Sequence, residues 1–148
     1  MKTSRAAFFF ATAEEAASAF YSAFEMCDIQ LMGAVWASES VSCLHPNSMP
    51  LLGRDEVLES WQHILSHANP PIIHVELIEE IIRDDLVIHV VIERLAESHK
   101  PDIPISMVLA TNVYVREKAG WRIAQHHAST PPVIEPFESD FEVSTTLQ

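Results

Sequence analysis

The chain has few basic residues and no long apolar run, and each shortage excludes a class of protein. Its 148 residues contain nine Lys and Arg against 21 Asp and Glu, which gives a formal net charge of −12 at pH 7. Nucleic acid and anionic membrane surfaces repel a chain this acidic, so we expect neither as a partner. No stretch of about 18 apolar residues is present, so no transmembrane helix is expected.

Glycine and cysteine are also scarce. Three glycines in the whole chain are too few for a glycine-rich phosphate-binding loop. Two cysteines, Cys27 and Cys43, cannot build a disulfide framework, and reduced thiols of a cytosolic protein are the simplest interpretation. The apolar run at residues 6–11 is too short for a secretory signal peptide. We therefore expect a cytoplasmic protein of about one domain.

The first half of the chain is patterned for three helices and a short strand. A capping box at Thr12–Glu15 begins the first helix, where the hydroxyl and the carboxylate cover free backbone amides. Asp28 is placed to cap the second helix, and apolar residues recur at helical spacing in all three. The expected helices are 12–27, 28–36 and 53 to just before Asn69, and the expected strand is 40–45.

The second half of the chain is patterned for strands. Four runs rich in Val, Ile and Thr are separated by short polar links, which favour an antiparallel meander over crossover helices. The expected strands are 72–82, 86–95, 105–115 and 121–129. Helices gathered on one side of such a sheet make an α+β domain. Residues 130–148 hold three prolines and an acidic, Ser/Thr-rich end, so we expect a loose acidic tail.

Three stretches share their order and spacing with a known family. They are Phe20-Tyr21-x6-Asp28-x7-Trp36, His45-Pro46-x6-Gly53-x3-Val57-x3-Trp61, and the last hairpin from Thr111-Asn112-Val113-Tyr114 to Gly120-Trp121-Arg122-Ile123 with His126-His127. Together they resemble the NTF2-like superfamily, and within it the SnoaL-like and ketosteroid-isomerase-like groups, over about residues 12–129. The resemblance implies a cone-shaped, cystatin-like domain in which three N-terminal helices pack on a strongly curved, mostly antiparallel sheet.

The resemblance to ketosteroid isomerases implies three catalytic residues. That group has a tyrosine on the first helix, a general base before a proline after the first strand, and an acid before the last hairpin; these places fall on Tyr21, His45 and Asn112. An imidazole exchanges protons near pH 7, and Tyr and Asn donate hydrogen bonds to an oxyanion. We expect the three to converge on one ligand oxygen, with His45 as base. The alternative is that they are satisfied polar residues in the cone.

Further residues are candidates for the wall of the cone. Strand alternation puts Tyr114 on the same face as Asn112. On the last strand, the resemblance places Gln125 and His127 in the cavity and turns His126 away from it. The candidate ligand-binding residues are Trp36, Trp61, Tyr114, Gln125 and His127. The two tryptophans are more often core residues than ligand platforms.

Two polar residues of the strand at 86–95 are left open. His89 and Glu93 are four positions apart, so they share one face of the strand. That face could line the cavity or could meet a dimer partner, and the period alone does not distinguish the two.

The patterns favour neither a metal nor a cofactor. His63 and His67 have helical spacing for a shared zinc ion, but no zincin glutamate lies between them and no third ligand is evident. A solvated helix end is therefore favoured. Neither cysteine is flanked by bases and no Gly-x-Ser-x-Gly occurs, which argues against nucleophilic catalysis.

Two functions are consistent with these patterns. The first is binding of a small apolar carbonyl compound in the cone, with the acid–base chemistry of an isomerase, cyclase or dehydratase, each of which needs a base and an oxyanion donor. The alternative is a non-catalytic ligand-binding or association module that forms a homodimer through the outer sheet face. Met107, Leu109, Val113 and Val115 make that face apolar, and exposed apolar strips usually meet a partner.

Overall fold

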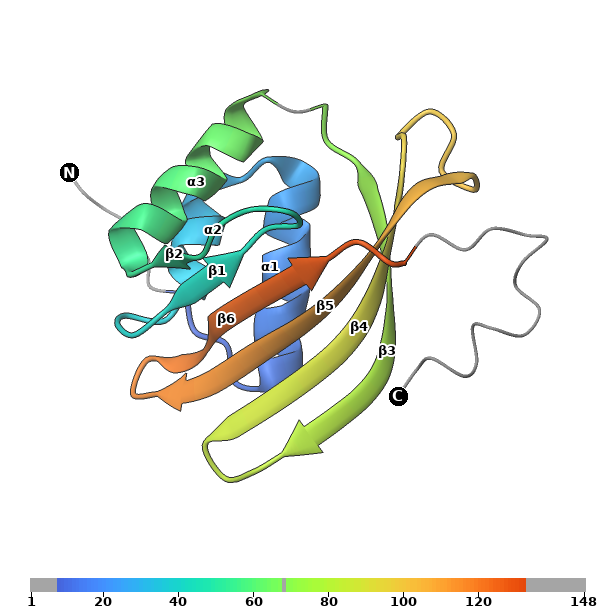
Figure 1. Ribbon diagram of the computed structural model, residues 1–148. Helices are drawn as coiled ribbons and strands as arrows, with labels where there is room; N and C mark the ends of the chain where they lie inside the picture. The colour runs from blue at the N-terminus through green and yellow to red at the C-terminus, as the bar shows by residue number, and fades with distance from the viewer. Residues whose placement is uncertain (1–7, 68, 133–148) are drawn as a thin grey trace.

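Three helices cover one face of a six-stranded sheet in the computed structural model, which describes residues 8–67 and 69–132 (Figure 1). The elements are α1 (Ala13–Met26), α2 (Ile29–Val35), β1 (Ser42–Leu44), β2 (Leu51–Leu52), α3 (Arg54–His67), β3 (Ile72–Ile82), β4 (Leu86–Ala96), β5 (Pro104–Glu117) and β6 (Gly120–Ser129). This arrangement confirms the predicted α+β class. Most of the predicted acidic tail, residues 133–148, lies outside the described residues. None of the described helices has the length and apolar character needed to cross a membrane.

The strands follow the order β2-β1-β6-β5-β4-β3. Strands β3 to β6 form the predicted antiparallel meander, and β1 pairs in parallel with β6. The last strand therefore lies between β1 and β5 rather than at an edge. The short strand β2, which pairs with β1, was not predicted, because two residues are too few to show an alternating pattern.

Side-chain caps begin the first two helices as predicted. The backbone N–H of Glu15 donates to the Thr12 hydroxyl at 3.0 Å, and the Glu15 carboxylate accepts from the N–H of Ala11 at 2.8 Å. The Asp28 carboxylate accepts from the N–H of Leu31 at 3.0 Å. These bonds occupy backbone donors that have no partner within a helix.

Arg54 joins the start of α3 to the end of α2. Its guanidinium donates to the carbonyl oxygens of Gly33 at 2.7 Å and of Trp36 and Ala37 at 3.0 Å each. Carbonyls at the end of a helix lack helical partners, so one side chain satisfies three acceptors at once. This contact fixes the start of α3 against the end of α2.

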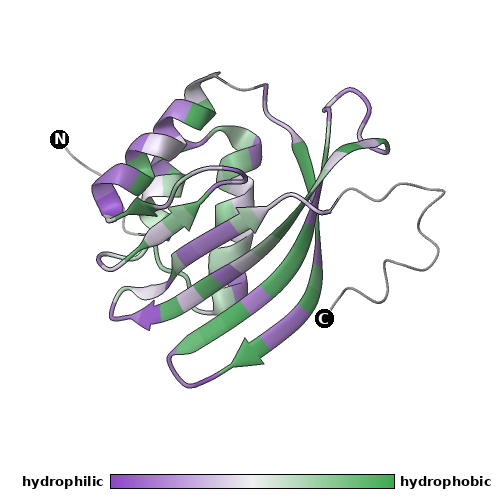
Figure 2. Ribbon diagram, viewed as in Figure 1, coloured by the Kyte–Doolittle hydropathy of each residue, from purple (hydrophilic) through white to green (hydrophobic). Residues whose placement is uncertain are grey.

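The hydrophobic core fills the space beneath α2 and α3. Phe20, Trp36 and Trp61 are all buried, and the ring of Phe20 meets the other two edge-to-face, with centroids 6.2 and 5.5 Å apart. Figure 2 shows that hydrophobic residues also dominate β4. The β4 side chains Ile88, Val90 and Ile92 alternate away from the helices, which leaves an apolar surface on that side.

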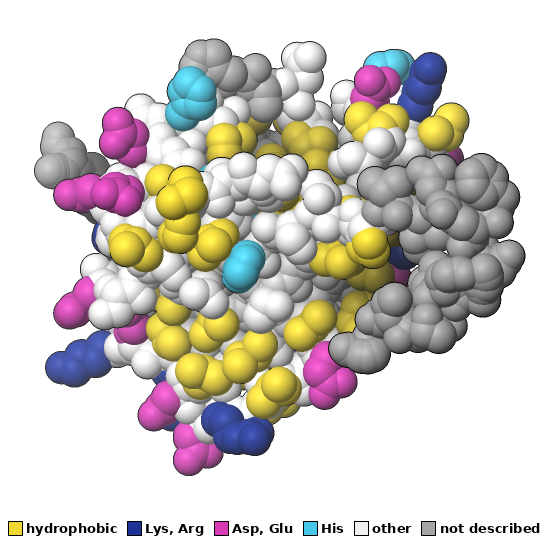
Figure 3. Space-filling view, in the orientation of Figure 1, with side chains coloured by type: hydrophobic (Ala, Val, Ile, Leu, Met, Phe, Trp, Pro, Cys, Tyr) yellow, Lys and Arg dark blue, Asp and Glu magenta, His cyan; other side chains and the backbone are white. Residues whose placement is uncertain are grey.

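The outer face of the sheet carries this apolar surface. The apolar side chains that alternate away from the helices include Ile81, Ile88, Val90, Ile92, Met107, Leu109, Val113 and Val115. Figure 3 looks onto this face and shows hydrophobic side chains gathered over the lower part of the sheet. We call this set of eight side chains the outer apolar face.

Some side chains of strand β6 face the opposite side of the sheet from the one predicted. The pairing steps from Tyr114↔Ile123 to Val113↔Gln125, so Ala124 is an extra, bulged residue. A bulge shifts the alternation of side chains by one position. His126 is therefore buried at 4% exposure, whereas His127 is exposed. The prediction that Gln125 and His127 face the interior and His126 faces away is wrong.

Candidate functional site

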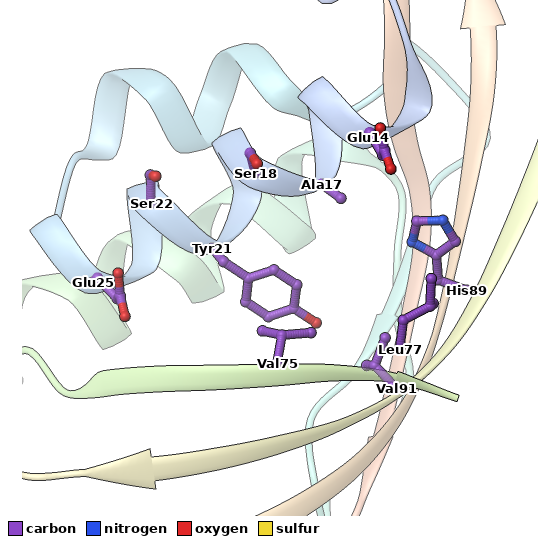
Figure 4. A pocket seen from close by; sticks show the side chains of 10 residues that line it. All are labelled: Glu14, Ala17, Ser18, Tyr21, Ser22, Glu25, Val75, Leu77, His89 and Val91. Atoms are coloured by element: carbon purple, nitrogen blue, oxygen red, sulfur yellow. The ribbon is translucent and has the colours of Figure 1, made fainter. Parts of the chain in front are cut away.

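A pocket of about 360 Å³ lies between α1 and the hairpin of β3 and β4. Its lining residues are Glu14, Ala17, Ser18, Tyr21, Ser22 and Glu25 from α1, and Val75, Leu77, His89 and Val91 from the hairpin (Figure 4). In Figure 4 the Tyr21 ring extends from the helix toward Val75, and the His89 ring rises from the strand toward Glu14. We call this space the α1 pocket.

The position of β3 explains why the α1 pocket is open. This strand is the edge of the sheet, and its register with β4 puts Val75 opposite Glu93 and Leu77 opposite Val91. Val75 and Leu77 remain 40% and 50% exposed, although they face the same side of the sheet as the buried residues of β4. The hairpin therefore presents apolar side chains to a space that residues 8–67 and 69–132 do not fill.

A chain of hydrogen-bonded polar groups lies behind the pocket. The Tyr21 hydroxyl donates to Glu93 Oε2 at 2.6 Å and accepts from Asn112 Nδ2 at 2.8 Å. Asn112 Oδ1 lies 2.6 Å from Nδ1 of His126. Because the amide oxygen only accepts, His126 Nδ1 carries the proton in this arrangement. In each of these three hydrogen bonds the donor is the group farther from Glu93, so the donors follow the order His126, Asn112, Tyr21.

Burial controls the charge of these groups. It raises the pKa of Glu93, although the hydrogen bond from Tyr21 acts in the opposite direction. It lowers the pKa of His126 to about 3, and the neighbouring His45 adds to this effect. It also raises the pKa of Tyr21, and the nearby Glu93 adds to the rise. Tyr21 and His126 are therefore neutral at pH 7.

The structure brings together two of the three predicted catalytic residues. Tyr21 and Asn112 share the 2.8 Å hydrogen bond described above. His45 is not part of the chain: its Nε2 lies 2.9 Å from the Ser60 hydroxyl, and its ring packs edge-to-face on Trp61 at 5.1 Å. The Trp61 ring also contacts His126, at 6.1 Å, and occupies the space beside both imidazoles. The structure thus joins Tyr21 to Asn112 directly, whereas the contacts of His45 are with Ser60 and Trp61.

The five predicted ligand-binding residues do not line the α1 pocket. Trp36, Trp61 and Tyr114 are buried members of the hydrophobic core. Gln125 donates to the Ser42 hydroxyl at 2.9 Å, and His127 is exposed on the opposite side of the sheet. Trp36, Trp61 and Tyr114 thus act as core residues, and the bulge accounts for Gln125 and His127.

A family model for the SnoaL-like domain matches residues 13–134. The chain belongs to the SnoaL-like family. This match confirms the predicted resemblance, and solved structures of the same fold agree with it. No curated protein matches the sequence.

Three solved structures illustrate the range of the fold around this SnoaL-like domain. One, from Thiobacillus denitrificans, carries the name of a putative calcium/calmodulin-dependent protein kinase type II association domain. It is 40% identical to this chain over 84% of this chain and 99% of its own, with a TM-score of 0.79. An NTF2-like protein from Streptomyces avermitilis, named in the same way as a dehydratase, is 28% identical over 80% and 92% of the two chains, with a TM-score of 0.70. A ketosteroid isomerase-like protein from Erwinia carotovora atroseptica shares the fold at 16% identity over 81% and 94%, with a TM-score of 0.63.

The SnoaL-like domain holds polar residues at the pocket that the sequence left open or did not indicate. His89 and Glu93 both face the interior and are buried. His89 Nε2 lies 2.9 Å from Glu80 Oε2, and the His89 ring contacts that of Tyr114 at 5.2 Å. The four-residue spacing of His89 and Glu93 was the available signal. Nothing in the sequence marked Glu80 as their neighbour.

Two further features complete the chemistry of the interior. The Tyr114 hydroxyl is buried without a hydrogen-bond partner among the described residues. In the same part of the chain, no cluster of three or more His, Cys, Asp or Glu side chains is arranged to hold a metal ion; the side chain of His67 lies outside that part. The groups available at the site are thus hydroxyls, carboxyls, an amide and imidazoles.

Proposed function

We propose that this SnoaL-like domain binds a small, largely apolar molecule in the α1 pocket. The observation that carries the proposal is the position of Tyr21. Its ring lines the pocket, and its hydroxyl is held by Glu93 and Asn112 in the buried chain. A hydrogen-bonding group held in place by a second layer of residues is suited to orient a polar atom of a ligand.

The energetics of the buried chain support a functional role. Burying a carboxyl, an amide and an imidazole costs free energy even when each is hydrogen-bonded, and apolar side chains of similar size are often as stable or more so. Groups with shifted pKa values gather at functional sites, and Glu93 and His126 are both shifted here. These hydrogen-bonded polar groups are therefore better explained by a role in ligand binding at the pocket than by a contribution to stability.

The lining of the α1 pocket indicates the kind of ligand. Val75, Leu77 and Val91 supply an apolar wall, and the volume of about 360 Å³ lies within the range of small-molecule sites. Glu14 and Glu25 also line the pocket, and the chain carries a net charge of −12. Both disfavour an anion. The preferred ligand is therefore neutral or cationic, with an apolar body.

The catalytic form of this proposal is acid–base chemistry on an apolar carbonyl compound, as in an isomerase, cyclase or dehydratase. Tyr21 is then the hydrogen-bond donor at the carbonyl oxygen when Glu93 is protonated, a form that the raised pKa of Glu93 favours: the carboxyl then donates to the Tyr21 oxygen, and the Tyr21 proton is free for the ligand. Asn112 positions Tyr21 rather than touching the ligand. Relatives named as a dehydratase and as ketosteroid isomerase-like, at 28% and 16% identity, support the reaction class without identifying the substrate.

A fragment titration tests the binding proposal. ¹⁵N-labelled protein is titrated with neutral, cationic and anionic apolar fragments, with 2-tetralone as the first neutral ketone, and amide shifts are followed by NMR. We expect the neutral and cationic fragments to shift amides around Ala17, Tyr21 and Val91. Tyr21→Phe should weaken binding about five- to tenfold, the equivalent of one hydrogen bond of about 1 kcal/mol.

The control for this titration is Met49→Gln, which changes a residue that is 81% exposed and is not part of the pocket lining. It should bind as the unchanged protein does. Shifts confined to other surfaces, or no shifts with any fragment, would contradict the proposal.

Self-association is a second candidate function, favoured by the outer apolar face. Eight apolar side chains gather there on neighbouring strands (Figure 3), and surfaces of this kind usually meet a partner. The relative that is 40% identical carries the name of an association domain. A homodimer through this face accounts for both observations.

Sedimentation equilibrium tests the homodimer. At micromolar concentration we expect twice the mass of one chain. Val113→Glu should produce monomers, because an unpaired charge buried in an interface costs about 3–5 kcal/mol. Val113→Leu, which keeps the face apolar, should remain dimeric. A single-chain mass for the unchanged protein would contradict the proposal.

A further inference from the structure

His89 and Glu80 form an imidazole–carboxylate pair at the strand side of the α1 pocket. They are register partners on β4 and β3, and Nε2 of His89 lies 2.9 Å from Oε2 of Glu80. The His89 side chain is 7% exposed and that of Glu80 is 33% exposed. The imidazole is thus enclosed by the pocket, while its partner reaches toward solvent.

The pair fixes which ring nitrogen of His89 is basic. An ionised carboxylate only accepts hydrogen bonds, so the nitrogen facing it carries the proton. That nitrogen is Nε2, which leaves the lone pair of the neutral ring on Nδ1. No hydrogen bond to Nδ1 is formed by the described residues. A basic nitrogen is therefore available on a ring that lines the pocket.

A bulge in β3 creates the pair. The pairing of β3 with β4 shifts between Leu77 and Glu79, so Ile78 is an extra residue. Past the bulge, the alternation turns Glu80 toward the interior and Glu79 toward the outer face, opposite Val90. Without the extra residue, Glu79 would face inward instead. Bulges often re-aim side chains beside functional sites.

We infer that His89 is the general base of the α1 pocket and that Glu80 is its positioning residue. The inference rests on the proposed ligand-binding function and gives the ligand a class: a neutral ketone with acidic hydrogens next to its carbonyl. It assigns proton transfer to a residue other than His45. Tyr21 lies in the same pocket and supplies the hydrogen-bond donor when Glu93, its acceptor in the structure, is protonated.

The proton transfer needs no further reactant. His89 Nδ1 takes a proton from the carbon next to the ligand carbonyl, and the electron pair of that C–H bond becomes a carbon–carbon double bond. The carbonyl π electrons move to oxygen, where the Tyr21 hydroxyl stabilises the enolate, with Glu93 in its protonated form so that it donates to Tyr21 and does not hold the Tyr21 proton. The imidazolium then returns its proton to carbon. Return to the same carbon exchanges hydrogen with solvent, and return to a conjugated carbon isomerises the ligand.

Deuterium uptake tests this inference. The probe is 2-tetralone in D₂O, with uptake next to its carbonyl followed by ¹H NMR and binding followed by amide shifts in the same samples. His89→Gln should keep binding but lower the exchange rate at least about 100-fold, the usual contribution of a general base. Glu80→Gln should lower it on the order of tenfold, as for other carboxylates that orient an imidazole. His74→Gln, at an exposed histidine of β3, is the control.

A second readout reports on Glu80 alone. The ¹⁵N shifts of the His89 ring should show a single tautomer protonated at Nε2 in the unchanged protein, and a mixture in Glu80→Gln. The tautomer reports the hydrogen bond from His89 to Glu80, and a loss of exchange that accompanies the loss of the single tautomer reports the positioning role. Protonation at Nδ1 in the unchanged protein would overturn the inference without reference to any ligand.

The possible results distinguish the role of His89 as general base from ligand binding in the α1 pocket. Pocket binding without exchange, or with exchange that His89→Gln leaves intact, overturns the inference and leaves ligand binding standing. Exchange lost in His45→Gln but not in His89→Gln transfers the role of base to His45. If none of the fragments binds in the pocket, both the proposed function and the inference fail.

Discussion

The interior between the helices and the sheet has an aromatic half and a polar half. Phe20 and Tyr21 are neighbours in sequence yet belong to different halves: Phe20 packs against Trp36 and Trp61, whereas Tyr21 bonds to Glu93 and Asn112. Large buried rings fill the aromatic half, and the polar half ends at the α1 pocket. Space for a ligand is therefore found beside α1 at the sheet edge.

The two halves are stabilised in different ways. In the aromatic half, the indole N–H groups of Trp36 and Trp61 have no hydrogen-bond partner among the described residues, so burial of ring area outweighs the loss of those bonds. In the polar half, each group of the chain is bonded to the next, and removing one leaves its neighbours unsatisfied. Four substitutions distinguish these two modes of stabilisation.

Trp61→Ala should have the largest effect. The ring contacts Phe20 and Phe24 at 5.5 and 5.2 Å, and its removal leaves a cavity in the aromatic half. We expect the free energy of unfolding to fall by about 3–5 kcal/mol, measured by urea denaturation. Leu52→Ala, at an exposed position, should change it by less than about 0.5 kcal/mol. A loss below 1 kcal/mol for Trp61→Ala would break the comparison, because the aromatic half would then not depend on packing.

Asn112→Leu probes the polar half with little change in volume. It leaves the hydroxyl oxygen of Tyr21 and the Nδ1–H of His126 without the amide that now bonds them. Each buried unsatisfied group costs about 1–3 kcal/mol, and the added apolar burial returns part of this, so we expect a loss of about 2–3 kcal/mol in urea denaturation. Thr111→Val, the neighbouring residue facing the other side of β5, is the control. An unchanged free energy of unfolding would show that the hydrogen bonds of Asn112 do not contribute to stability.

His126 should make the protein sensitive to acid. Its pKa is about 3 in the folded protein against 6.5 for an unperturbed histidine, so its contribution to stability is complete above pH 6.5 and is lost as the pH falls toward 3. Between pH 7 and pH 5 the loss from this residue should be about 2 kcal/mol. His126→Gln keeps a donor for Asn112 but does not titrate, and its stability should fall by that much less. Equal losses in the two proteins, measured by urea denaturation at both pH values, would contradict the burial of a neutral imidazole.

Glu93 should have the smallest effect, with the opposite sign. Burial raises its pKa above the unperturbed 4.5, so its contribution to stability is complete below pH 4.5 and is lost as the pH rises through the folded value. Glu93→Gln keeps an acceptor for Tyr21 and cannot ionise. We expect its stability to decline less than that of the unchanged protein between pH 4.5 and pH 8. A steeper decline in the variant would show that the ionised carboxylate stabilises the polar half.

The helices and strands were predictable because their signals are local. The capping box at Thr12–Glu15 and the cap at Asp28 begin helices where expected, and the run at 72–82 is β3 residue for residue. The two-residue strand β2 has no such signal, since it depends on its pairing with β1. Local sequence signals thus determine the helices and the long strands, while β2 depends on pairing with a distant part of the chain.

The site was less predictable because two bulges determine it. The extra residue at Ala124 turns His126 inward and His127 outward, and the extra residue at Ile78 turns Glu80 toward His89. Strand alternation read from sequence assumes an unbroken period of two, and it fails past each bulge. The resemblance did bring Tyr21 and Asn112 together correctly, while the role of each remains a proposal.

The place of β6 between β1 and β5 has a consequence for synthesis of the chain. β1 is made early, yet its parallel partner is residues 125–127, which leave the ribosome more than eighty residues later. Until then β1 and β2 cannot join the sheet, and β5 offers an unpaired apolar edge. Contacts between distant parts of a chain form slowly, and exposed edges favour aggregation during that delay. A nascent chain stalled before residue 120 should therefore remain bound to chaperones, whereas one released after residue 129 closes its sheet in a single late step.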